Sequence, residues 1–126
     1  QRSYKINPVN PEALAWLIYI LCFHLGKPSL AAHLVKKILE IDPLTPLNQC
    51  CPLCYYWMEG RLDLALEYSR KWHTMESDNS MTGWYLAIFM ALNNDHEGTY
   101  NFIDQTYNKN PEDLFSKLLI IFKYAL

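Results

Sequence analysis

A fixed period of 34 residues runs through this chain of 126 residues and limits what it can fold into. One period separates Gly26 from Gly60, and two periods separate Trp16 from Trp84. The same spacings relate Ala31 to Ala65 and Pro43 to Pro111. A unit of this length is too small to bury its own apolar face, so successive units must stack on one another. The sequence therefore predicts a repeat array.

Composition agrees with a folded array and argues against two classes of partner. Apolar residues make up 51% of the chain and charged residues 19%, which is typical of globular proteins. The formal net charge is -2, without the excess of Lys and Arg that binds nucleic acid or an anionic membrane surface. The longest apolar run, residues 13–23, is shorter than the roughly 18 residues that span a bilayer. We therefore expect no nucleic-acid partner and no membrane partner.

Helix starts and breaks can be placed from local residue types. An Asn or Thr followed by Pro supplies a capping oxygen and then a residue that suits the first turn, and this pattern occurs at Asn10-Pro11, Thr45-Pro46 and Asn110-Pro111. Breaks are expected at residues that accept a left-handed backbone, namely Gly26, Gly60 and Asn94. No stretch alternates as a half-buried strand does. The prediction is all-α, with three antiparallel helical hairpins and the opening helix of a fourth.

Pro52 is the residue that conflicts with a regular helix. Inside a helix it removes one hydrogen bond and clashes with the preceding turn. We expect the helix that contains it to start late or to bend there.

Several of these residues resemble the tetratricopeptide repeat family. The first unit has Gly26 at the turn, Ala31 five residues later and a closing run at residues 38–43. The second keeps the turn at residues 59–63, and the third has Asn94 in place of the turn glycine. The resemblance covers about residues 12–126 and implies a right-handed superhelix in which the first helix of each hairpin lines a concave groove. It divides the chain into a lead-in (1–10), repeats at 11–45, 46–79 and 80–113, and the first helix of a truncated fourth repeat (114–126).

The groove-facing positions that the resemblance implies are apolar and aromatic, and none is Lys, Arg or Asn. They are Ala13, Trp16, Leu17, Ile20, Phe23, His24, Leu47, Cys50, Cys51, Cys54, Trp57, Met58, Met81, Trp84, Tyr85, Ile88 and Leu92. Family members that hold the acidic C-terminal peptides of chaperones use Lys, Arg and Asn here, because a carboxylate needs charge-assisted donors. This clamp is excluded. Such a groove either binds an apolar segment or is filled within the same protein.

The cysteines raise a chemical alternative. Cys51 and Cys54 form a C-x-x-C pair beside Cys50, and such a pair can be redox-active or supply half of a zinc site. A thioredoxin-like site needs a βαβ unit, and zinc needs two further ligands that the four histidines do not supply at motif spacing. We expect packed free thiols, with no metal and no cofactor. Four unpaired cysteines also fit a reducing compartment, so we expect a cytoplasmic protein.

We therefore predict a non-catalytic protein–protein interaction or scaffold module, a segment of a larger regulatory protein. No Gly-rich phosphate loop, nucleophile elbow or H-E-x-x-H helix is present. The expected partner is a protein or peptide with an apolar or amphipathic segment, and the expected contact residues are Trp16, Ile20, Phe23, Cys54, Trp57, Trp84, Tyr85 and Ile88. Two alternatives stay open. One is a structural spacer or homodimerisation element whose groove is filled intramolecularly, and the other is a thiol redox or metal site at the C-x-x-C pair.

Overall fold

The computed structural model describes residues 10–126, so all of the predicted lead-in except Asn10 lies outside the described residues. The described residues contain helices and no strand, which confirms the all-α prediction. The chain forms two compact units, Gln1–Tyr68 (unit 1) and Ser69–Leu126 (unit 2). The boundary between the units falls within helix α5 (Leu62–Met75).

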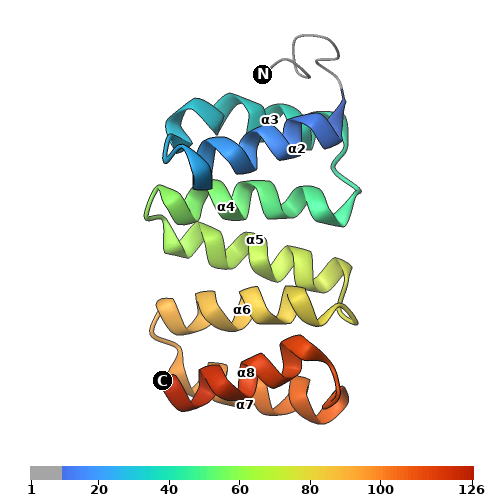
Figure 1. Cartoon of the computed structure of the whole chain (residues 1–126), viewed down its shortest axis with the longest axis vertical. Helices are drawn as coiled ribbons and strands as arrows, with labels where there is room; N and C mark the ends of the chain where they lie inside the picture. The colour runs from blue at the N-terminus through green and yellow to red at the C-terminus, as the bar shows by residue number, and fades with distance from the viewer. Residues whose placement is uncertain (1–9) are drawn as a thin grey trace. The chain divides into compact units, whose positions relative to one another are not determined.

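Within its described residues, unit 1 contains three α-helices besides the start of α5, and they pack against one another (Figure 1). They are α2 (Pro11–Tyr19), α3 (Ala32–Ile41) and α4 (Cys50–Met58). A π-helical turn, η1 (Ile20–His24), continues α2, and the 3-10 turns η2 (Pro28–Ala31) and η3 (Pro46–Gln49) precede α3 and α4. The apolar faces of these elements form one core, made of Leu14, Leu17, Ile18, Leu21, Cys22, Ala31, Leu34, Val35, Ile38 and Cys51.

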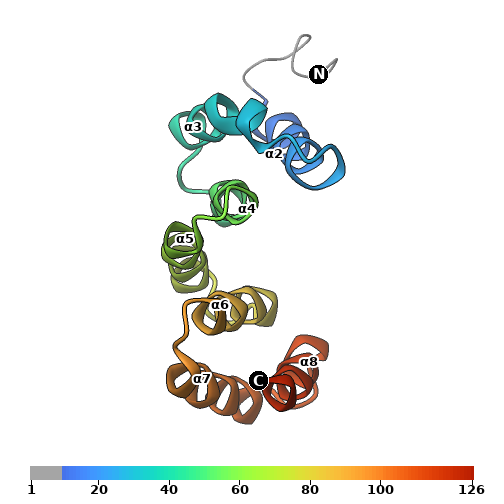
Figure 2. The same ribbon diagram turned by 90° about the vertical axis from the view of Figure 1, so that its left-hand side faces the viewer.

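Unit 2 contains α6 (Ser80–Leu92), α7 (His96–Lys109) and α8 (Leu114–Ala125). Each of these helices packs against the other two, and Figure 2 shows α8 beside α7 and near α6. Ala87, Ile103 and Leu119 form the buried centre. The partly buried side chains packed around it are Trp84, Phe102, Ile120 and Phe122.

The three predicted inter-helix breaks are confirmed by the backbone. Gly26, Gly60 and Asn94 have positive φ angles of 60°, 76° and 65°. Asn is one of the few residues with a side chain that adopt this conformation without a large penalty, so Asn94 can replace the turn glycine. Five residues after each turn, Ala31, Ala65 and Thr99 have no exposed surface, so the 34-residue period is also a period of burial.

The predicted helix start at Asn10 is confirmed, but the one at Thr45 takes another form. The Asn10 Oδ1 atom accepts a hydrogen bond from the backbone N–H of Ala13 at 3.2 Å. The Thr45 side chain makes no capping bond, and the residues after it form the 3-10 turn η3. The α-helix then begins at Cys50, which places Pro52 in its first turn, where a missing N–H costs little. The late start that Pro52 predicted is therefore confirmed.

The expected helix start at Asn110-Pro111 is wrong. Asn110 closes α7, and its backbone N–H donates to the Thr106 carbonyl at 3.2 Å. Helix α8 begins at Leu114, where the Asp113 carboxylate accepts from the N–H groups of Phe115 at 2.8 Å and Ser116 at 3.2 Å. A cap of this kind satisfies donors that have no partner inside the helix. Asp113, and not Asn110, is the capping residue.

Candidate functional site

An exposed apolar face lies on α2 and on the first residue of η1, which continues it. The side chain of Trp16 is 61% exposed, that of Tyr19 43% and that of Ile20 41%. Residues three and four positions apart on a helix are neighbours on its surface, so the three side chains form one patch. We call Trp16, Tyr19 and Ile20 the α2 face. Of the predicted contact residues, it includes Trp16 and Ile20.

Aromatic rings connect this face to the interior of unit 1. The ring centroids of Trp16 and Tyr19 are 6.1 Å apart, and those of Tyr19 and Phe23 are 5.2 Å apart. Phe23 then meets Trp57 of α4 edge-on at 5.8 Å and also packs against the core. The α2 face is therefore supported by further rings beneath it, which limits the conformational freedom of its side chains.

The sequence prediction missed Tyr19, although its signal was present. Tyr19 lies three residues after Trp16 and four before Phe23, which is the spacing of one helix face. Its ring also meets that of His24 at a centroid distance of 5.4 Å. The family resemblance drew attention to positions 16, 20 and 23, whereas the exposed surface also includes position 19.

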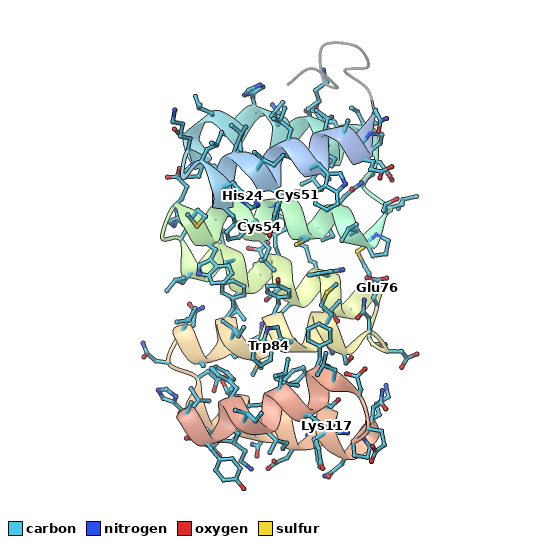
Figure 3. The ribbon with its side chains drawn as sticks, viewed as in Figure 1. His24, Cys51, Cys54, Glu76, Trp84 and Lys117 are labelled. Atoms are coloured by element: carbon cyan, nitrogen blue, oxygen red, sulfur yellow. The ribbon has the colours of Figure 1, made fainter. Side chains whose placement is uncertain are left out.

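The predicted contact residues of unit 2 are partly buried. Trp84 of α6 meets Phe122 of α8 at a ring-centroid distance of 5.8 Å. The ring centroids of Tyr85 and Trp72 are 5.8 Å apart, and Ile88 is partly buried. Figure 3 labels Trp84 on α6. The structure therefore gives Trp84 a packing partner within unit 2.

The sulfur atoms form a different arrangement from the expected C-x-x-C pair. Figure 3 labels Cys51 and Cys54, both of α4, but the sulfur contact at 3.6 Å joins the Sγ atoms of Cys50 and Cys54. Cys54 is only 5% exposed, so its side chain offers almost no surface to a partner. All four cysteines are free thiols, as expected.

The thiols differ in acidity for identifiable reasons. Burial, with a smaller contribution from Glu59, raises the pKa of Cys22 to about 11, and burial raises the pKa of Cys51 to about 12. The hydrogen bond between the thiols of Cys50 and Cys54 lowers the pKa of Cys50 and raises that of Cys54. Cys50 is therefore the thiol that ionises most readily.

Two further observations bear on function. In the part of the chain that the structure describes, no group of three or more His, Cys, Asp or Glu side chains is arranged to hold a metal ion. Across the same residues, no helix combines the length and the apolar character needed to cross a membrane.

Comparison of the chain with protein-family models and with curated proteins found no match.

Proposed function

We propose that the chain is a tetratricopeptide-like array that acts as a non-catalytic interaction module, and that its partner binds the α2 face. The array is supported by the left-handed turn residues Gly26, Gly60 and Asn94, which recur every 34 positions. Repeats of this kind bury their apolar faces against neighbouring repeats and present the remaining surface to partners. The proposed function follows from which apolar side chains remain exposed.

The exposure of Trp16 is the observation that carries this proposal. A large indole with 61% of its surface in solvent gains considerable apolar burial when a partner covers it. Trp and Tyr are also the residues that most often dominate binding energy at interfaces. Trp16 and Tyr19 therefore fit the role of anchors.

The chemistry of the α2 face specifies the partner segment. From Pro11 to His24 the one acidic residue is Glu12, and there is no Lys or Arg. A partner therefore loses little by bringing apolar groups here, because few charges need to be desolvated. From Trp16 to Phe23 the rings cover about two helical turns, or roughly 10 Å. This length matches an amphipathic helix with apolar side chains at i, i+3 or i+4, and i+7. We take such a helix from another protein as the occupant.

The spacer alternative has one specific observation in its favour. The contact of Trp84 with Phe122 means that an expected groove side chain packs against a helix of the same unit and is partly buried there. Unit 2 is therefore better suited to a structural role than to binding through Trp84. We assign partner binding to unit 1 alone.

Selection of helical peptides against the purified chain tests the proposal. A displayed library of amphipathic helices supplies the ligands, and fluorescence anisotropy measures the Kd of each selected peptide. Trp16→Ala should weaken binding at least about tenfold, a loss of roughly 1.4 kcal/mol. Leu44→Ala is the matched control, because Leu44 is 82% exposed, belongs to unit 1 and lies outside the α2 face.

Two results would contradict the proposal. Peptides that bind Trp16→Ala and the parent chain equally would place the binding surface elsewhere. A mass in light scattering that doubles with concentration, and returns to one chain in Trp16→Ala, would identify a second copy as the occupant. Circular dichroism of each variant must retain the parent helicity for the comparison to hold.

A further inference from the structure

Cys50 and Cys54 differ from the other thiols of unit 1. Cys22 and Cys51 belong to the buried core, whereas the Sγ atoms of Cys50 and Cys54 lie 3.6 Å apart. Cys50 is partly exposed and Cys54 is buried. A partly exposed cysteine is therefore in sulfur contact with a buried one.

Cys50 and Cys54 flank the first turn of α4. Cys50 is the first residue of α4 and directly follows the 3-10 turn η3. Pro52 lies between the two cysteines in this first turn, where its missing N–H costs little. A disulfide requires its sulfurs to be about 2.05 Å apart, so the pair can close only if this turn moves. Helix ends fray more readily than helix interiors, so the position of Cys50 at the first residue of α4 favours such a movement.

We propose that Cys50 and Cys54 form a site of reversible oxidation, at which a hydroperoxide converts the two thiols into an intramolecular disulfide. In the first step the Cys50 thiolate attacks a peroxide oxygen and the O–O bond breaks. The leaving oxygen takes a proton and departs as water or an alcohol, and Cys50 becomes a sulfenic acid. The peroxide is thereby reduced by two electrons.

The second step takes place within the pair. The Cys54 sulfur attacks the Cys50 sulfur, the S–S bond forms and the S–OH bond breaks. The hydroxide leaves as water with the proton from the Cys54 thiol. Reduction by an external thiol reverses the change through a mixed disulfide.

The surroundings of the two sulfurs assign their roles. Cys50 is the more exposed of the two cysteines, and its hydrogen bond with Cys54 lowers its pKa, so Cys50 is the attacking group. The pKa of Cys54 is raised, so Cys54 stays protonated. Its sulfur lies 3.6 Å from that of Cys50, so Cys54 is the resolving thiol that attacks the sulfenic acid. Cys22 and Cys51, with raised pKa values, remain unreactive by comparison.

Mass spectrometry of the whole chain treated with hydrogen peroxide tests the site. After the remaining thiols are alkylated, we expect two fewer alkylated cysteines, a mass lower by two hydrogens, and full recovery on addition of dithiothreitol. Cys50→Ser should slow this oxidation at least about tenfold. Cys54→Ser should accumulate a Cys50 sulfenic acid that dimedone traps. Cys51→Ser is the matched control and should form the disulfide at the parent rate.

Several outcomes would overturn the proposal. They are an unchanged rate in Cys50→Ser, loss of the disulfide in Cys51→Ser, a bond between two chains, and oxidation only in denaturant. Cys54→Ala provides a second variant in case serine at this buried position unfolds unit 1. The proposal does not depend on partner binding, so Trp16→Ala should be oxidised like the parent chain.

Discussion

The Nδ1 atom of His73 lies 2.8 Å from the hydroxyl oxygen of Thr82. The Thr82 hydroxyl is buried and donates its own proton to the Asn79 carbonyl at 2.7 Å. It must therefore accept from His73, which assigns the imidazole proton to Nδ1. The rings of His73 and Phe102 lie nearly perpendicular to each other, with their centroids 5.3 Å apart. The hydrogen bond between His73 and Thr82 joins the end of α5 to the first turn of α6 within unit 2.

The stability of unit 2 should depend on pH through His73. Burial, with a smaller contribution from Lys109, lowers the pKa of His73 below its ordinary value of 6.5. The unfolded chain then binds a proton more readily than the folded chain. The contribution of His73 to stability is therefore complete above about pH 6.5, and it is lost as the pH falls through the pKa of His73 in the folded chain. Urea titrations followed by circular dichroism should give a lower free energy of unfolding at about pH 5.5 than at about pH 7.5.

Two variants assign this pH dependence. His73→Gln removes the titrating group and should flatten the change between the two pH values. His33→Gln is the control, because His33 is an exposed residue of α3 in unit 1. The pKa values of Asp78 and Asp113 are lowered, so these carboxylates contribute at more acidic pH. Equal pH dependence in the parent chain and in His73→Gln would contradict the assignment.

Asn94 should tolerate glycine but not alanine. Its φ of 65° is in the left-handed region, where a residue with a Cβ costs roughly 1–2 kcal/mol unless it is Asn or Asp. We expect Asn94→Ala to lower the free energy of unfolding by about 1 kcal/mol, and Asn94→Gly to change it by less than about 0.5 kcal/mol. Thermal unfolding measures both.

Gly60 provides the matched comparison for Asn94. Its φ is 76°, and a Cβ added there meets no atom within 4 Å, so Gly60→Ala tests the backbone term without a steric clash. A loss of about 1 kcal/mol is expected here as well. An Asn94→Ala protein as stable as the parent chain would show that the turn can adopt another conformation.

The helices and their breaks could be predicted because they depend on local chemistry. Gly26, Gly60 and Asn94 end helices through their own backbone preferences, so a single sequence is enough to find them. The start of α8 was misplaced because Asn110 and Asp113 are both capable caps on either side of Pro111. Which of them caps the helix depends on how α7 and α8 pack.

The candidate site was harder to predict because exposure depends on distant residues. The helical pattern treats Trp16 and Trp84 alike, yet Trp84 is partly buried and packs against Phe122, which lies on another helix. The Cys50–Cys54 contact was accessible from the sequence, since residues four apart share a helix face. Attention to the C-x-x-C spacing directed the prediction to Cys51 instead.

Ser116 should be replaceable by alanine with a gain in stability. Ser116 has no exposed surface, and its Oγ atom has no hydrogen-bond partner. Removing an unsatisfied buried hydroxyl should raise the free energy of unfolding by about 1 kcal/mol, because its desolvation is uncompensated. Ser80→Ala should instead lower the free energy of unfolding. The Ser80 hydroxyl has a partner, because it donates to Asp113 and lowers the pKa of that carboxyl. A destabilised Ser116→Ala protein would indicate that the hydroxyl is bonded in solution.

The two tryptophans should separate packing from recognition. Trp84 packs against Phe122 and the centre of unit 2, so Trp84→Ala should lower the free energy of unfolding by about 2–4 kcal/mol. Trp16→Ala removes a mostly exposed ring and should cost less than about 1 kcal/mol. Urea titrations followed by circular dichroism measure both losses. If Trp84→Ala is as stable as the parent chain, the Trp84 ring does not support the fold, and the assignment of partner binding to unit 1 alone loses its basis. If Trp16→Ala is strongly destabilised, the α2 face is part of the core in solution and cannot serve as the partner surface.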